Sequence, residues 1–206
     1  MKTVGHWIGG KYVDGDSGRT APVTDPATGE VTAEVALASV ADVDLAVAAA
    51  SEAAADWTRS SLSTRTRVLF RYRELLDRRR DEIASLITAE HGKVHADALG
   101  EVARGIEVVE FACSIPQLLK SAGSYEVSTG VDVREIRQPL GVVAGITPFN
   151  FPAMVPLWMF PMAIACGNSF ILKPSEKDPS AALRVADLMA EAGLPPGVLN
   201  VVNGDV

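Results

Sequence analysis

The segment from Gly145 to Pro152 holds the densest group of residues that could do chemistry. It reads GITPFNFP, an apolar strand that ends in a proline-rich turn with a single side-chain amide, that of Asn150. An amide held among prolines and aromatic rings loses little orientational freedom when it donates a hydrogen bond to a developing oxyanion. Asn150 is therefore a candidate oxyanion donor, and the alternative is an asparagine that only stabilises the turn.

A second group of charged residues follows the next apolar strand, residues 170–172. It reads KPSEK, with Lys173 and Glu176 three residues apart. The two can bracket a ribose, because an ammonium donates to hydroxyl oxygens and a carboxylate accepts from hydroxyl groups. The alternative is an exposed ion pair in a loop. If both strands belong to a parallel sheet, the two turns meet at its carboxyl edge, where such sheets bind ligands.

The remaining reactive side chains do not form a recognisable constellation. Cys113 and Cys166 are far apart, lack CxxC spacing and lie among apolar residues, so we predict two buried structural thiols and no metal site. His6, His91 and His95 have no partner pattern and are interpreted as surface or helix-end residues. Glycine spacing in residues 141–145 does not fit GxGxxG, so no phosphate-binding loop is visible.

The C-terminal third of the chain predicts the elements that would position these turns. Strand-like and helix-like segments alternate, with strands at 141–146, 169–172 and 198–202 and helices that begin near Met154 and at Asp178-Pro179. Asp178 is expected to cap the second helix, since proline follows it at the first helical position. The pattern predicts an α/β fold with a doubly wound parallel sheet.

The rest of the chain predicts a hairpin, helices and a projecting ribbon. Residues 6–13 suggest the hairpin, and Ser39 with Asp42 has capping-box spacing before an alanine-rich helix to Trp57. Helical patterns follow at residues 63–87 and from Gly92 to about Lys120, and residues 124–138 predict a two-stranded ribbon. Acidic residues are interleaved with the arginines of the first helical pattern, which favours a solvated face over a nucleic-acid surface.

Composition narrows the class of protein. The 206 residues are 48% hydrophobic and 22% charged, as in globular proteins. A net charge of -7 opposes binding to nucleic acid or anionic lipid. The start of the chain lacks an apolar run of signal-peptide length, and prolines interrupt the longest apolar segment, residues 151–166, so we expect a cytoplasmic protein.

Taken together, the motifs resemble the aldehyde dehydrogenase superfamily along essentially the whole chain. The resemblance rests on the strings WIGG at residues 7–10, EHGK at 90–93, ITPFNFP at 146–152, WMFP at 158–161, LKPSE at 172–176 and NVVNG at 200–204. Phe149, where many hydrolytic members have tryptophan, and the WMFP string make the chain most similar to the CoA-acylating methylmalonate-semialdehyde dehydrogenase branch.

The resemblance assigns roles to individual residues. Asn150 matches the oxyanion-stabilising asparagine. Lys177 stands where relatives often have arginine, which keeps the charge but loses the planar fork. The implied cofactor contacts are Thr147 and Phe149 on the nicotinamide side and Lys173, Glu176 and Lys177 around the adenosine ribose.

Arg104 matches the arginine that pairs with the substrate carboxylate in this branch. Spacing alone favours an ion pair on the helix surface with Glu101 or Glu107, and the resemblance reverses that preference.

The resemblance implies NAD-dependent oxidation of malonate or methylmalonate semialdehyde to acetyl-CoA or propionyl-CoA by a homotetramer. The family's nucleophilic cysteine lies beyond Val206, so we expect this stretch to be inactive alone. The expected parts are the N-terminal hairpin and the helical part of the NAD-binding domain at residues 1–123, an oligomerisation ribbon at 124–138, and the first part of an incomplete NAD-binding sheet at 139–206. A hydrolytic aldehyde dehydrogenase with another substrate and a non-catalytic nucleotide-binding or interaction module are the alternatives.

Overall fold

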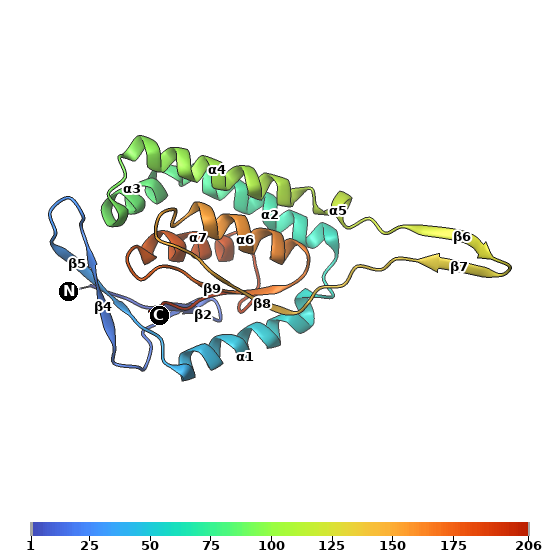
Figure 1. The fold of residues 1–206 in the computed structure, drawn as a ribbon, viewed down its shortest axis with the longest axis horizontal. Coiled ribbons are helices and arrows are strands. Elements are labelled where there is room, and N and C mark those ends of the chain that lie inside the picture. Colours follow the sequence, from blue (N-terminus) through green and yellow to red (C-terminus); the bar gives the residue numbers. More distant parts are fainter. Residues whose placement is uncertain (1, 206) are drawn as a thin grey trace.

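A five-stranded sheet lies at the centre of the molecule (Figure 1). A computed structural model describes residues 2–205, and Met1 and Val206 lie outside the described residues. The strand order is β3-β2-β10-β9-β8, where β8, β9 and β10 are parallel. Their bounds are Val142–Ile146 for β8, Ser169–Lys173 for β9 and Leu199–Val201 for β10. The predicted parallel strands are confirmed for the C-terminal third of the chain.

The predicted N-terminal hairpin forms one edge of the same sheet. Its strands are β2 (His6–Ile8) and β3 (Lys11–Val13), which pair antiparallel. Trp7 of β2 pairs antiparallel with Val201 of β10, so the complete sheet is mixed rather than parallel throughout.

Helices cover both faces of the sheet, as a doubly wound fold requires (Figure 1). Helix α1 (Val40–Trp57) packs on one face. Helices α6 (Met154–Ala165) and α7 (Pro179–Glu191) pack on the other and connect the parallel strands. Parallel neighbours need such crossovers, because a short turn cannot return the chain to the start of the next strand. The carboxyl ends of β8 and β9 therefore lie together.

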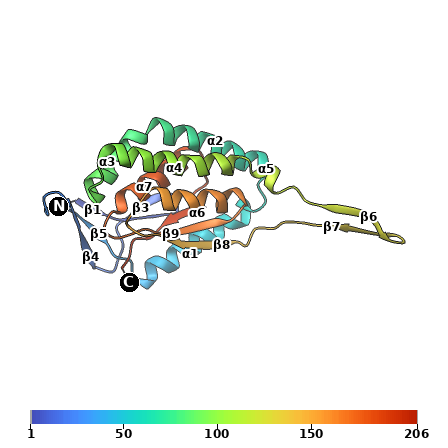
Figure 2. The same ribbon diagram turned by 45° about the horizontal axis from the view of Figure 1, so that its top comes forward.

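Four further helices form an outer layer over α6 and α7 (Figure 2). They are α2 (Leu62–Arg78), α3 (Arg80–His91), α4 (His95–Cys113) and the short α5 (Ile115–Leu118). The helical pattern at residues 63–87 is divided at Arg79, whose φ of -105° and ψ of 12° are not helical. Arg73 pairs with Asp77 and Glu110, which confirms an ion-paired, solvated face. Among residues 2–205, no helix is long and apolar enough to cross a membrane.

The ribbon projects away from the body of the molecule (Figures 1 and 2). Its strands are β6 (Gly123–Ser128) and β7 (Val131–Arg134), and all their residues are exposed. Gly130 has a φ of +74°, which a turn at this position requires and glycine adopts without strain. The predicted ribbon is confirmed, with residues 135–138 outside its strands.

A second sheet near the N-terminus was not predicted. Its strands are β1 (Lys2–Val4), β4 (Thr20–Thr24) and β5 (Val31–Ala36), in the order β1-β5-β4. Val23 of β4 and Val35 of β5 are fully buried. The sheet lies at the end of the molecule opposite the ribbon (Figure 1).

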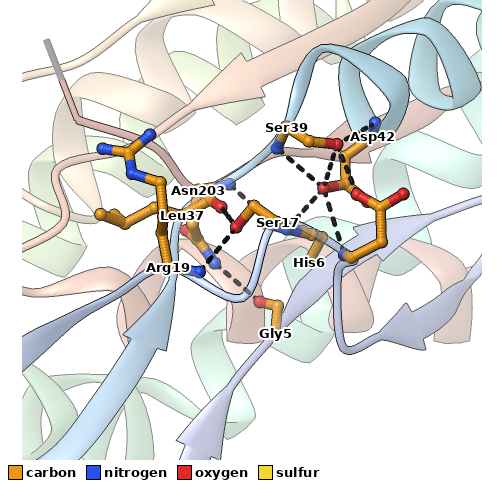
Figure 3. A network of polar contacts seen from close by, with 9 residues as sticks. Gly5, His6, Ser17, Arg19, Leu37, Ser39, Asp42 and Asn203 are labelled. Carbon is orange, nitrogen blue, oxygen red and sulfur yellow. Dashed lines mark hydrogen bonds and ion pairs between the residues drawn. The ribbon is translucent and has the colours of Figure 1, made fainter.

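His6 corrects one prediction, because it is fully buried rather than a surface residue. Figure 3 shows its ring between Asn203 and Asp42. The Asn203 backbone N–H donates to His6 Nδ1 over 3.1 Å, and the Asn203 side chain donates to the Gly5 carbonyl over 2.6 Å. Asp42 lies 3.9 Å from His6 Nε2 and completes the predicted capping box with Ser39. Burial lowers the pKa of His6, so the network joins β2 to α1 with a neutral imidazole.

Candidate active site

The two predicted turns meet at the carboxyl edge of the sheet. Thr147, directly after β8, donates its backbone N–H to the carbonyl of Lys173 at the end of β9 over 3.0 Å. This edge faces the end of the molecule away from the ribbon (Figure 1). The structure thus brings the two groups of candidate residues together, as the parallel arrangement predicts.

The turn after β8 presents Asn150 to solvent and fixes its backbone. Within residues 2–205 the Asn150 side-chain amide donates no hydrogen bond, whereas its carbonyl accepts one from Lys93 Nζ over 2.7 Å. The Phe149 ring is 48% exposed, and Lys177 Nζ lies 4.4 Å from its centroid. Thr147 is buried, and its hydroxyl has no partner in the described part of the chain. The turn therefore offers an unoccupied amide and an unoccupied hydroxyl beside an aromatic surface.

Lys173 and Glu176 lie close enough to bind one ligand. The Lys173 Nζ to Glu176 Oε2 distance is 3.4 Å, and their side chains are 25% and 32% exposed. The pair is thus half-buried rather than fully solvated. An ammonium and a carboxylate at this separation can hold the two hydroxyl groups of a vicinal diol.

Arg104 lies on α4 and is exposed. Its guanidinium pairs with Glu107 over 2.5 Å, one of the two partners that the spacing suggests. Glu101, the other suggested partner, is buried and points elsewhere. Within residues 2–205 no hydrogen bond or ion pair joins Arg104 to the Asn150 turn.

Lys93 and Glu101 belong to the site but were missed as functional residues. Lys93 entered the sequence argument only through the EHGK string, and Glu101 only as a surface partner of Arg104. In the structure Glu101 accepts hydrogen bonds from the backbone N–H groups of Ala153 and Met154, at the start of α6. The signal was hidden because these partners are more than 50 residues away in the sequence and are backbone groups.

Asp178 also differs from its prediction. It stands at the N-cap position of α7, but its side chain makes no capping bond. Among the described residues both of its carboxylate oxygens lack hydrogen-bond partners, although the residue is 2% exposed. Glu90 on α3 caps α7 instead, accepting the Ser180 N–H over 3.0 Å. Burial and the nearby Glu90 charge raise the pKa of Asp178 to about 7.

The two cysteines lie away from this edge, as expected of structural thiols. Cys113 is buried at the end of α4, and burial raises the pKa of its thiol to about 11. Cys166 follows α6 at the opposite end of that helix from the Asn150 turn. It is only partly buried, which corrects the prediction of a buried thiol, and this partial burial also raises its pKa. Both thiols are protonated near neutral pH, so neither is poised as a nucleophile.

Comparisons with known proteins agree with this geometry. Residues 12–206 match the family model described as aldehyde dehydrogenase family. Malonate-semialdehyde dehydrogenase 3 of Geobacillus kaustophilus is 56% identical over 203 residues, covering 98% of this chain and 42% of that protein.

The chain also has the same fold as the matching part of solved aldehyde dehydrogenase structures. The methylmalonate-semialdehyde dehydrogenase of Oceanimonas doudoroffii has a TM-score of 0.98 and 55% identity, over 100% of this chain and 42% of the other. A Sinorhizobium meliloti 1021 protein assigned to the same enzymes, solved with NAD, has a TM-score of 0.98 and 53% identity over the same shares. The chain spans about 42% of the length of these relatives.

Proposed function

The chain belongs to the aldehyde dehydrogenase family, and on that premise we propose that a protein containing it oxidises malonate or methylmalonate semialdehyde with NAD and CoA. The aldehyde carbon would be oxidised to the acyl level, with NAD as the hydride acceptor and CoA as the acyl acceptor that forms a thioester. Loss of the substrate carboxylate as carbon dioxide gives acetyl-CoA or propionyl-CoA.

The observation that carries the proposal is the free side-chain amide of Asn150 at the carboxyl edge of the sheet. Its backbone is held by Lys93, and its amide is not used within residues 2–205. A fixed, unoccupied donor at this edge suits a carbonyl oxygen that gains negative charge, because the donor does not have to reorganise as the charge develops.

The neighbouring residues fit a dinucleotide cofactor. Thr147 offers a buried hydroxyl without a partner in the described chain, at the point where β8 ends. Lys173 and Glu176, 3.4 Å apart, suit the two hydroxyl groups of a ribose. Lys177 and Phe149 stack against each other beside them and can form one wall of the site. NAD, when bound, supplies the hydride acceptor, and these residues bind and orient it.

The assignment of the substrate rests on Arg104 and on the named relatives. Within residues 2–205 the exposed Arg104 guanidinium pairs with one acid, the exposed Glu107, and it can exchange that partner for a substrate carboxylate at little cost. The malonate- and methylmalonate-semialdehyde dehydrogenases among the similar proteins support a substrate with such a carboxylate.

The test of this function needs a chain that contains a nucleophile. The experiment would therefore fuse residues 1–206 to the part of the Geobacillus kaustophilus relative that this chain does not cover. We expect the fusion to produce NADH from malonate semialdehyde in a CoA-dependent reaction, and Asn150→Ala to lower kcat by about 100- to 1000-fold. An unchanged kcat would contradict the role of Asn150, and NADH formation that is independent of CoA would favour hydrolytic chemistry.

Arg104→Leu in the same fusion tests the substrate. We expect kcat/KM for malonate semialdehyde to fall by about 10- to 100-fold, since a charge-assisted pair is lost. Use of propionaldehyde, which has no carboxylate, should stay within about twofold. Equal losses with both aldehydes would refute the assigned contact.

The 206-residue chain by itself is expected to be inactive. Calorimetric titration with NAD distinguishes this proposal from that of a stand-alone nucleotide-binding module. Tight binding by a monodisperse chain would favour the module, whereas turnover of semialdehyde by the purified chain would refute the expected inactivity.

A further inference from the structure

We propose that Lys93 and Glu101 are positioning residues that hold the Asn150 turn in its productive shape, an inference that rests on the role proposed above for Asn150. Neither residue touches the reacting atoms in this proposal. Lys93 acts through the Asn150 carbonyl, and Glu101 acts through the backbone N–H groups that end the turn.

Glu101 fixes the downstream end of the turn. Its Oε1 accepts the backbone N–H groups of Ala153 over 2.9 Å and Met154 over 3.1 Å. Helix α6 has no side-chain cap from its own sequence within the described chain, so these N–H groups would otherwise lack a protein partner. A carboxylate at a helix N-terminus is also favoured by the helix dipole. Glu101 on α4 therefore caps α6 from another element.

Lys93 fixes the upstream end and neutralises the cap. Its Nζ donates to Glu101 Oε2 over 2.5 Å and to the Asn150 carbonyl over 2.7 Å, and lies 4.1 Å from the centroid of the Phe151 ring. The Glu101 side chain is 1% exposed, so its charge requires such a partner. One ammonium thus joins the buried carboxylate to the residue that carries the candidate oxyanion donor.

Two glycines allow this arrangement. Gly92 ends α3 with a φ of +84°, in the left-handed region that glycine favours, and directs the chain into Lys93. Gly105 lies one turn after Glu101 on α4, and a Cβ there would be 2.5 Å from Leu157 Cδ1 on α6. The close approach of α4 and α6 brings Glu101 to the first turn of α6.

The pair therefore controls both ends of a four-residue segment. With Thr147 held at the end of β9, the backbone from residue 147 to residue 154 is fixed at three points. Loss of Lys93 releases the Asn150 carbonyl and leaves the Glu101 charge without its cation. Displacement of the Asn150 amide by about 1 Å can lower a rate by about 100-fold.

A double-mutant cycle in the fusion enzyme separates positioning from general stability. Lys93→Met keeps most of the side-chain length and removes the charge. We expect kcat to fall by about 10- to 100-fold while KM for NAD stays within about twofold, because the ribose contacts are elsewhere. In the Asn150→Ala background, Lys93→Met should change kcat by less than about twofold, since there is no amide left to position.

The possible outcomes are distinct. If Asn150→Ala has no effect, the proposed function fails. If Asn150→Ala lowers kcat but Lys93→Met does not, or if the two losses simply multiply, the positioning role is overturned while the function stands. Lys93→Arg, which can still donate to both oxygens, should restore most of the activity. Lys11→Met, at an exposed lysine on β3, is the control and should match the unmodified fusion.

A second measurement does not depend on catalysis. In the 206-residue chain, hydrogen exchange reports the protection of the Ala153 and Met154 amides that Glu101 accepts. Lys93→Met should raise exchange of the Ala153 and Met154 amides by at least about tenfold more than it raises exchange in β9, which reports the global loss of stability. An equal rise at these two amides and in β9 would overturn the proposal even if the fusion enzyme were inactive.

Discussion

Two helices that begin at the carboxyl edge of the sheet are capped by carboxylates from other helices, and the two carboxylates differ in their surroundings. Glu101 on α4 caps α6, and Glu90 on α3 caps α7. Glu101 is paired with Lys93. Glu90 is partly buried and lies beside a buried acid, Asp178, and burial raises the pKa of both carboxyl groups.

The difference shows two ways of keeping a carboxylate in a poorly solvated place. Beside α6 a cation compensates the charge, and the same cation reaches the Asn150 carbonyl. Beside α7 the pKa of Asp178 is about 7, so a proton compensates part of its charge near neutral pH. The stability contributed by the second arrangement should therefore depend on pH.

The largest expected effect on stability is that of Lys93→Met. The substitution leaves the buried Glu101 charge without its cation, and such a loss costs about 3–5 kcal/mol of unfolding free energy. Urea denaturation of the 206-residue chain at pH 7 measures it. Lys11→Met should stay within about 0.5 kcal/mol. A loss below about 1 kcal/mol would mean that the cation is not what compensates Glu101.

Asp178→Asn should raise the unfolding free energy, whereas Lys93→Met should lower it. The pKa of Asp178 is raised from 3.8 to about 7, so between these values the folded state holds a proton that the unfolded state has lost. Stability from this group therefore falls as pH rises from about 4 to about 7 and is constant above that window. Replacing the acid should raise the unfolding free energy by about 2–4 kcal/mol at pH 8 and by little at pH 4.

Denaturant titrations at pH 4, 6 and 8 on both chains provide the test. A constant difference between them at every pH would show that the carboxyl group of Asp178 does not titrate in this window. His6 contributes a slope of opposite sign below about pH 6.5, because burial lowers its pKa. That contribution is common to both chains and cancels in the comparison.

The sequence predicted the turns at the carboxyl edge of the sheet better than the contacts that hold these turns and the following helices in place. The strand at 141–146 and the Asn150 turn follow from a short apolar run that ends in prolines, and both lie where the pattern placed them. Asp178-Pro179 also begins a helix as predicted. These features depend on neighbours in the sequence, which local propensities describe well.

The contacts that hold the turns and helices in place join residues that are distant in the sequence. Glu101 meets α6 across 52 residues, and Glu90 meets Ser180 across 90 residues. Both partners are backbone N–H groups, which every residue except proline carries, so the residue type does not reveal the contact. His6 was misplaced for the same reason, because its partner is the backbone of Asn203. The three-stranded N-terminal sheet was missed because its pairing joins short strands from separate segments.

Glu90→Gln tests whether the two acids beside α7 interact. The glutamine oxygen can still accept the Ser180 N–H, so the cap of α7 is kept. Removal of the like charge should lower the pKa of Asp178 and narrow the pH window in which stability falls. We expect a change of about 1 kcal/mol in the pH-dependent part of the unfolding free energy. An unaltered window would leave burial and the more distant Glu101 charge as the causes of the raised pKa of Asp178.

Lys173→Met should have the smallest effect on stability and separates binding from folding at this edge. Its pair with Glu176 is half-exposed, and such pairs contribute at most about 1 kcal/mol. We therefore expect a near-normal unfolding free energy, in contrast to Lys93→Met. If the pair holds the ribose of NAD, the same substitution in the fusion enzyme should raise KM for NAD by about tenfold with little change in kcat. A large loss of stability with unchanged KM would instead place Lys173 among the structural charges, like Lys93, and remove it from the proposed cofactor site.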